Sequence, residues 1–197
     1  MGISQGGTLT PPAGKRDHVQ GPADAPVTLL EYGDFECSYC GAAYLIVKKV
    51  QEIMGDQIRF VFRHSPLTQI HPHAEPAAEA SEAADMQGRF WEMHDLLYEN
   101  QPMLDSRHLV GYAQELGLDT KRFVSELEAH VHRPRVREDF LSGVRSGVNG
   151  TPAFFINGAR YDGSWDILPL VKVLQGAVRE TQPADRVLTW RSGRAGI

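Results

Sequence analysis

The chain has 197 residues, of which 42% are hydrophobic and 23% charged, and its formal net charge at neutral pH is -5. This composition is ordinary for a globular protein with one core, or with one domain that carries a sizeable insertion. The acidic balance argues against nucleic acid or an anionic membrane as a partner. No stretch approaches 18 consecutive apolar residues, so we expect no membrane insertion.

The first 26 residues are rich in Gly, Pro and polar residues and contain no apolar region of the kind that a secretory signal needs. We therefore expect a cytoplasmic protein, unless an export signal has been removed from the sequence. Residues 1–16 are predicted to form a flexible arm, and Gly21, Pro22 and Pro26 precede the first core strand.

The only two cysteines lie at the junction between a predicted strand and a predicted helix. The run 27–30 reads as a buried strand, and apolar residues recur from Cys40 to Met54 with the spacing of one helix face. Gly55 follows as a natural helix end. Cys37 is thus predicted at a helix N-terminus, where free N–H groups and the helix dipole favour a thiolate.

A Cys-x-x-Cys pair can be a structural disulfide, half of a zinc site, a redox couple or an accident of composition. A bridge that closes so short a loop constrains the unfolded chain very little, which makes a structural role the weakest interpretation. Zinc needs further ligands, and the sequence has no second Cys-x-x-Cys and no His-x-x-x-His. The redox interpretation requires the helix-terminal geometry that the pattern predicts.

Residues 57–63 alternate as a second strand, with Ile58, Phe60 and Phe62 opposite Arg59 and Arg63. Strand, helix and strand together form a βαβ unit, which implies parallel pairing and a right-handed crossover. The cysteines then lie at the carboxyl end of a parallel strand, where open α/β sheets place their sites.

Residues 67–146 are predicted to be helical, with Asp105 and Asp119 as N-caps and Pro134 in the first turn of a last helix. The acids between His71 and Asn100 are expected to form a solvated helix face. They are Glu75, Glu79, Glu82, Asp85, Glu92, Asp95 and Glu99. His71 and His73 flank a proline, and we expect helix-terminal polar contacts for them more than metal binding.

Strand character returns at 151–156, and Asn157-Gly158 before a second short strand is a strong hairpin signal. A closing helix is expected over about 166–180. The predicted fold is therefore α/β, with a discontinuous framework of residues 17–66 and 147–181, an inserted helical domain over 67–146, and a second flexible arm over 182–197.

Several of these features together resemble the DsbA family of thioredoxin-fold thiol-disulfide oxidoreductases, over about residues 17–180. The resemblance rests on the following segments: Glu31 six residues before Cys37, the run 34–40 (DFECSYC), 62–67 (FRHSPL), 87–91 (QGRFW) and 150–152 (GTP). It implies a thioredoxin-like fold and a redox reaction that uses no organic cofactor. It does not imply the direction of electron flow.

The resemblance also implies roles for individual residues. Cys37 matches the exposed attacking cysteine, and Cys40 matches the buried cysteine that resolves the mixed disulfide. Glu31 matches a buried acid that exchanges a proton with Cys40. Pro152 matches the family's cis-proline, whose preceding residue, Thr151, presents its backbone to an extended substrate. Ser38 and Tyr39, between the cysteines, are expected to contact the same substrate, a protein or peptide thiol or disulfide.

The sequence departs from the strongly oxidising members of the family, which carry Pro-His between the cysteines. Tyr39 can do less than such a histidine to stabilise the thiolate, and Asp34 and Glu36 oppose the helix dipole if they point towards sulfur. We therefore expect a couple that is less oxidising than those members.

Three alternatives remain open at the level of sequence. One is a glutathione-dependent transferase or isomerase on the same fold, which would not need Cys40. Another is a non-enzymatic metal-binding module that uses Cys37, Cys40 and a histidine. The third is a chaperone-like peptide binder in which the cysteines are incidental.

Overall fold

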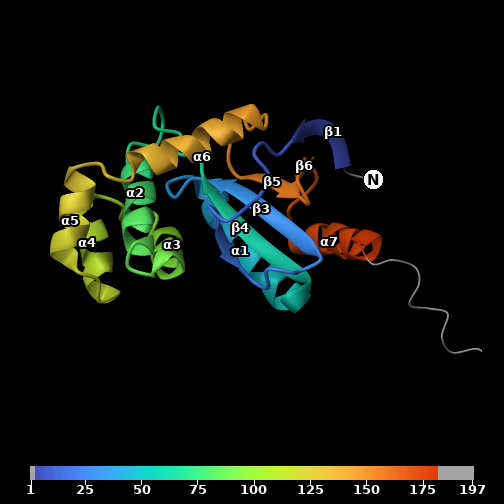
Figure 1. Ribbon diagram of the computed structural model, residues 1–197, viewed down its shortest axis with the longest axis horizontal. Coiled ribbons are helices and arrows are strands. Elements are labelled where there is room, and N and C mark those ends of the chain that lie inside the picture. Colours follow the sequence, from blue (N-terminus) through green and yellow to red (C-terminus); the bar gives the residue numbers. More distant parts are fainter. Residues whose placement is uncertain (1–2, 182–197) are drawn as a thin grey trace, which may run out of the picture.

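The computed structural model describes residues 3–181 of the chain (Figure 1). Its sheet has six strands in the order β1, β6, β5, β3, β4, β2. The central strands β3 (Val27–Gly33) and β4 (Ile58–His64) are parallel and are joined by α1 (Ser38–Met54). The predicted βαβ unit is confirmed.

The remaining strand pairs are antiparallel. These strands are β1 (Ile3–Thr8), β2 (His18–Gln20), β5 (Ala153–Ile156) and β6 (Ala159–Tyr161). β5 and β6 form the predicted hairpin, because Asn157 and Gly158 both have positive φ, 48° and 83°. Such a turn twists in the same sense as the strands that it joins.

Helices cover both faces of the sheet. Val27 and Leu29 of β3 pack in one hydrophobic cluster with α1 and with α7 (Ile167–Thr181), whereas Leu30 and Tyr32 belong to a cluster on the opposite face. Side chains alternate along a strand, so Glu31 points to the α1 face. On the other face, the Tyr32 hydroxyl lies 2.7 Å from the hydroxyl of Ser142 in α6.

The chain between β4 and β5 contains the other helices, and α2 to α5 lie together beside the sheet while α6 runs back across it (Figure 1). Their bounds are α2 Ala74–Asp85, α3 Phe90–Glu99, α4 Ser106–Glu115, α5 Thr120–Glu128 and α6 Arg133–Arg145. The carboxylates of Asp105 and Asp119 accept from the N–H groups of the first turns of α4 and α5, as predicted. The α/β class with a helical insertion is confirmed, and the insertion's bounds, 67–146, stay a prediction.

The predicted flexible arm over residues 1–16 is wrong for its described part. β1 pairs with β6, the N–H of Leu9 donates to the carbonyl of Gly158 at 2.9 Å, and the Leu9 side chain is buried. The physical reason is that β6 would otherwise leave an open edge of unpaired backbone groups. The second predicted arm, 182–197, lies outside the described residues.

The expected solvated acidic face is also wrong in part, because Glu79 and Glu82 of α2 are buried. Glu82 Oε1 accepts from the Nε2 atoms of His18 and His64, at 2.8 and 2.9 Å. Arg135 of α6 lies 3.8 Å from the same oxygen. These partners come from β2, β4 and α6, so a pattern that is local to α2 could not predict them.

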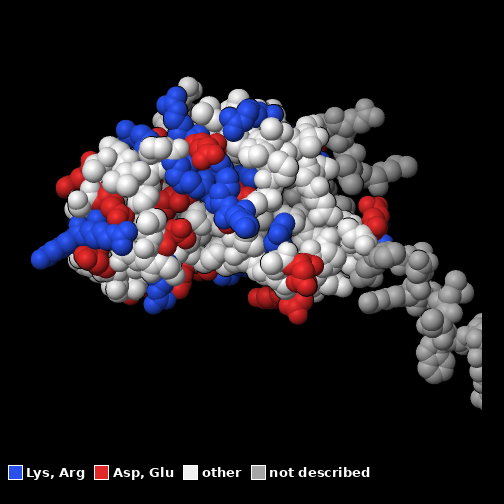
Figure 2. All heavy atoms as spheres, viewed as in Figure 1, with Lys and Arg blue, Asp and Glu red and all other residues white. Residues whose placement is uncertain are grey.

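Figure 2 shows Lys and Arg side chains gathered near α6, with acidic side chains among them.

Arg63, predicted on the polar side of an alternating strand, is fully buried. Its Nε and Nη2 atoms donate to the two carboxylate oxygens of Asp17 at 2.8 and 3.0 Å, and Nη1 donates to Tyr32 Oη at 3.0 Å. A buried guanidinium is tolerated only when it is paired in this way. The pair ties the segment before β2 to the centre of the sheet.

Candidate active site

Cys37 lies at the N-cap position of α1, as predicted, with extended backbone angles. Its carbonyl accepts the N–H of Gly41 at 3.1 Å, which begins the helix. Both cysteines are free in the structure. Cys37 is 6% exposed and Cys40 is fully buried. Cys37 is thus less exposed than the attacking role implied by the resemblance would suggest, although of the two cysteines it is the one that solvent reaches.

The environment pushes the pKa values of the two thiols in opposite directions. Hydrogen bonding by the Cys40 side chain, with help from the N–H groups of Cys40 and Tyr39, lowers the pKa of Cys37 to about 5 against the opposing effect of burial. Burial raises the pKa of Cys40, and the neighbouring Cys37 and the charge of Glu31 raise it further. Near neutral pH the arrangement therefore favours a Cys37 thiolate beside a Cys40 thiol.

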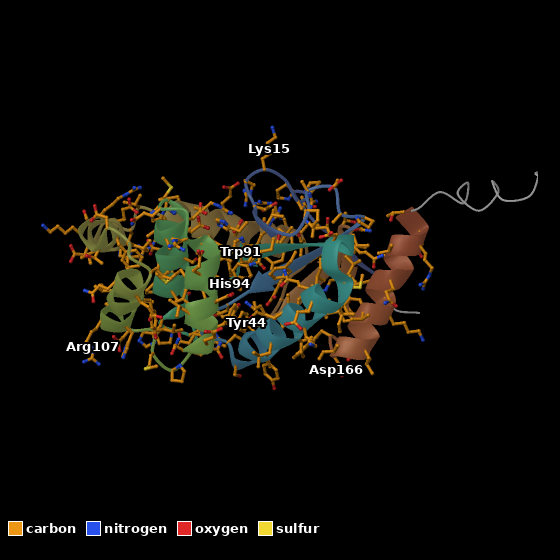
Figure 3. All side chains as sticks on the ribbon, turned by 90° about the horizontal axis from the view of Figure 1, so that it is seen from below. Lys15, Tyr44, Trp91, His94, Arg107 and Asp166 are labelled. Carbon is orange, nitrogen blue, oxygen red and sulfur yellow. The ribbon has the colours of Figure 1, made fainter. Side chains whose placement is uncertain are left out.

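Glu31 lies on the α1 face of β3 and is 2% exposed, and its Oε1 atom has no hydrogen-bond partner within the described part of the chain. Burial, with a smaller effect from the charge of Cys37, raises the pKa of Glu31 to about 8. The carboxyl borders a cavity of about 10 Å³ that Tyr44 and His94 also line. Figure 3 shows these two side chains where α1 and α3 approach each other. Such a volume approaches the space that one water molecule needs.

The loop before β5 lies against the cysteines. The carbonyl oxygen of Thr151 is 3.5 Å from Cys37 Sγ, and the Thr151–Pro152 peptide bond is cis. Ser38 and Tyr39 are both exposed, and Tyr39 keeps 68% of its surface in solvent. The structure thus brings Thr151 and Pro152 to the cysteines from the far end of the chain. Substrate contact by Ser38, Tyr39 and Thr151 stays a prediction.

Sequence reasoning missed Gln101, which follows α3. Its Nε2 atom donates to the carbonyls of Phe35 and Cys37, at 2.8 and 2.9 Å, and so holds the turn that leads into α1. A Cβ atom at Gly41 would lie 2.2 Å from the Gln101 amide oxygen, so a larger residue there would displace the amide. No local pattern marks Gln101, because its partners lie 64 and 66 residues earlier in the chain.

Asp34 and Glu36, the acids before Cys37, are each bound by a histidine of the segment after β4. Asp34 Oδ2 accepts from His71 Nδ1 at 2.8 Å, and Glu36 Oε1 accepts from His73 Nδ1 at 2.9 Å. His73 is also the N-cap of α2. The histidines therefore make the polar contacts near a helix start that the sequence favoured over metal binding.

Within residues 3–181, one group of three side chains could share a metal ion, and it consists of His18, His64 and Glu82. Neither cysteine belongs to this group. The alternative of a metal module built on Cys37, Cys40 and a histidine thus finds no third ligand near the sulfurs among the described residues.

The fold and the site together define a class, that of thioredoxin-fold proteins with a Cys-x-x-Cys pair at a helix start. A family model described as thioredoxin matches residues 14–175. The chain therefore belongs to the thioredoxin family. Its fold within that family is DsbA-like.

Solved structures show the same fold. BdbD from Bacillus subtilis superposes with a TM-score of 0.79 at 22% identity, over 88% of this chain and 99% of that one. Wolbachia pipientis alpha-DsbA1 gives 0.74 at 18% identity, over 87% and 95%. A thioredoxin-like oxidoreductase from Silicibacter pomeroyi gives 0.72 at 26% identity, over 85% and 92%. The family and these neighbours support an oxidoreductase.

The curated relatives carry different names. A protein of Salinispora arenicola named Na(+)/H(+) antiporter NhaA 1 is 47% identical over 186 residues, which are 92% of this chain and 28% of that protein. The antiporter NhaA of Herminiimonas arsenicoxydans is 44% identical over 175 residues, 88% of this chain and 28% of its own. The chain thus spans little more than a quarter of these relatives. None of the helices among residues 3–181 combines the length and the apolar character of a membrane span.

Proposed function

We propose that this chain is a thiol-disulfide oxidoreductase that acts on protein or peptide thiols through a reversible Cys37–Cys40 disulfide. The observation that carries the proposal is the geometry of the pair, with Cys37 at the N-cap of α1 and Cys40 fully buried three residues further along the helix. This environment lowers the pKa of Cys37 to about 5 and raises that of Cys40. A pair of this kind has one thiolate ready to attack and one thiol in reserve.

In the oxidising direction, a substrate thiolate attacks Cys37 Sγ of the disulfide, and Cys40 leaves with the electron pair of the S–S bond. A second substrate thiolate then attacks the substrate sulfur of the mixed disulfide, which releases an oxidised substrate and the Cys37 thiolate. In the reducing direction, Cys37 attacks a substrate disulfide and Cys40 resolves the mixed disulfide. Two electrons move between sulfurs, so no organic cofactor takes part.

Glu31 is suited to handle the proton of Cys40. With a pKa of about 8, its carboxyl is mostly protonated at neutral pH and can donate to the Cys40 thiolate as that sulfur leaves. When Cys40 becomes the attacker, the ionised carboxylate takes the proton back. The small cavity beside Glu31 approaches the volume of one water molecule, so the carboxyl is nearly closed off from solvent.

The test is an equilibrium titration of the protein in glutathione buffers, followed by thiol labelling. The pKa of Cys37, about 5, lies between the values of about 7 for thioredoxin and about 3.5 for the most oxidising members. We therefore expect a reduction potential between about -270 and about -120 mV. Absence of a reversible two-electron transition refutes the proposal.

Variants separate this function from the alternatives. Cys40→Ser should accumulate a mixed disulfide at Cys37 with a cysteine-containing peptide, and the matched Cys37→Ser variant should not. Full turnover of a glutathione conjugate by Cys40→Ser would instead favour the transferase. Peptide binding that is unchanged in Cys37→Ser, without redox turnover in the wild type, would favour the chaperone-like binder.

We also propose that the partner of this redox chemistry is a membrane cation antiporter or a protein associated with one. Two relatives, with 47% and 44% identity, are named Na(+)/H(+) antiporters, and this chain matches only 28% of each. The matched portion is therefore joined, in those proteins, to a larger portion of the same chain, and this supports the proposed partner. Deleting the matched portion from the Salinispora arenicola relative should change how Na⁺/H⁺ exchange in membrane vesicles responds to dithiothreitol. An identical response with and without this portion contradicts the proposed partner.

A further inference from the structure

The carboxylates of Asp34 and Glu36, which precede Cys37, accept hydrogen bonds from the segment that follows β4. Besides His71, Asp34 accepts the N–H groups of Glu36 and Leu67, both at 2.8 Å. Glu36 accepts both the N–H and the ring Nδ1 of His73, at 2.6 and 2.9 Å. We call these two pairs, Asp34–His71 and Glu36–His73, the histidine clamp.

Asp34 is the more demanding half of the clamp because it is 1% exposed. A buried carboxylate is strongly unfavourable unless hydrogen bonds and an opposite charge compensate it. The carbonyl of Asp34 accepts the Cys37 N–H at 3.2 Å, so its charge and the attacking sulfur belong to one tight turn. In this setting an uncompensated carboxylate would disfavour a second negative charge on Cys37.

His71 can supply the compensating charge. Burial lowers its pKa, but the hydrogen bond and charge of Asp34, together with the charges of Cys37 and Glu36, outweigh burial and raise it. The ionisable groups that face His71 are Asp34 and Glu36 before α1 and Cys37 at its start; His73 lies on its own segment. The dipeptide between the cysteines, Ser38-Tyr39, offers no such charge.

We propose that His71 is a positioning residue for the redox chemistry, which offsets the buried Asp34 carboxylate and so favours the Cys37 thiolate. The positive charge near Cys37 thus comes from an imidazole of the segment after β4, because the dipeptide between the cysteines contains no histidine. The Glu36–His73 pair carries no part of this role, because the His73 side chain is 47% exposed and solvent screens the pair. The inference rests on the proposed function, since it concerns the same sulfur.

The test is the pH dependence of Cys37 alkylation by iodoacetamide in the reduced protein, with the modified residue identified by mass spectrometry. His71→Gln keeps a hydrogen-bond donor for Asp34 but removes the charge. We expect the midpoint of its profile to move to higher pH by about half a pKa unit, so that the reactive fraction falls about threefold well below the wild-type midpoint and about twofold at that midpoint. His71→Lys, which restores a positive charge, should recover most of the loss.

The chain offers a matched control. His108 Nδ1 lies 2.8 Å from Asp105 Oδ2 at the start of α4, and its side chain is 28% exposed, against 20% for His71. His108→Gln removes a histidine–aspartate pair of the same geometry away from the cysteines. It should leave the alkylation profile of the wild type unchanged.

A profile of His71→Gln that coincides with that of His108→Gln overturns the inference, and so does a failure of His71→Lys to restore reactivity. If His71→Gln does not fold, Asp34→Asn decides the question: its Cys37 midpoint should fall below that of the wild type, and an unchanged midpoint refutes the role. Alkylation of Cys37 requires no catalytic turnover, so this assay tests the histidine clamp independently of the proposed function. The proposed function is refuted separately, if the wild-type protein forms no reversible disulfide in glutathione buffer.

Discussion

Replacement of Glu31 by glutamine should stabilise the protein, and increasingly so as the pH rises. The carboxyl is 2% exposed and its pKa is raised from 4.5 to about 8, chiefly by burial. An acid with a higher pKa in the folded state holds its proton there after the unfolded chain has lost it. Its contribution to stability is therefore fully present below pH 4.5 and is lost as the pH rises to about 8.

The size of the effect follows from the same values. Each pKa unit corresponds to about 1.4 kcal/mol, so ionising Glu31 in the folded protein costs on the order of 5 kcal/mol. Glutamine has nearly the same shape and carries no charge, so Glu31→Gln avoids this cost. The gain in unfolding free energy over the wild type should grow by several kcal/mol between the acidic and alkaline ends of this range.

The assay is urea denaturation of the oxidised protein across this pH range, followed by tryptophan fluorescence. Oxidation removes the Cys37 charge and leaves burial, the larger cause, to be tested. Glu128→Gln, a change at an exposed side chain of α5, is the control and should leave the pH dependence unchanged. A stability difference between Glu31→Gln and the wild type that does not vary with pH would refute the buried-acid reasoning.

Other changes test the site and the core. The alkylation rate of Cys37 should have its midpoint near pH 5, and a midpoint near that of a free thiol, about 8.5, contradicts the assigned environment. Asp17→Ala leaves the buried Arg63 guanidinium without its carboxylate and should cost about 3–5 kcal/mol in urea denaturation; a loss below about 1 kcal/mol, typical of surface pairs, contradicts this. Gly33→Ala puts a Cβ 2.4 Å from the Phe62 ring and should destabilise by about 1–3 kcal/mol. Its control, Gly111→Ala, meets no atom within 4 Å in α4 and should gain up to about 1 kcal/mol; equal effects of the two glycine changes would contradict the close contact.

Local patterns predicted much of the fold correctly. The βαβ unit, the start of α1 at the cysteines, the caps Asp105 and Asp119 and the Asn157-Gly158 turn follow from periodicity, capping and turn preferences. These signals act between residues that are close in sequence, so the chain carries them without reference to its tertiary contacts. The placement of Cys37 at a helix N-terminus is of this kind.

Features that depend on distant segments could not be predicted in the same way. β1 pairs with β6 from the opposite end of the chain, and the Arg63 guanidinium is buried because Asp17 and Tyr32 surround it. Glu82 was predicted to be a solvated acid, but His18 of β2 and His64 of β4 both bind its carboxylate.

The same division holds within the site. By itself the sequence determined that two cysteines would meet a helix start after a buried strand, and its resemblance to the DsbA family named Glu31 and Pro152 as partners. Only the tertiary structure decided that Gln101 holds the cysteine turn and that His71 binds Asp34. The physical reason is that hydrogen bonds and charges act through space, and the fold alone determines which distant groups come within a few ångströms of the sulfur.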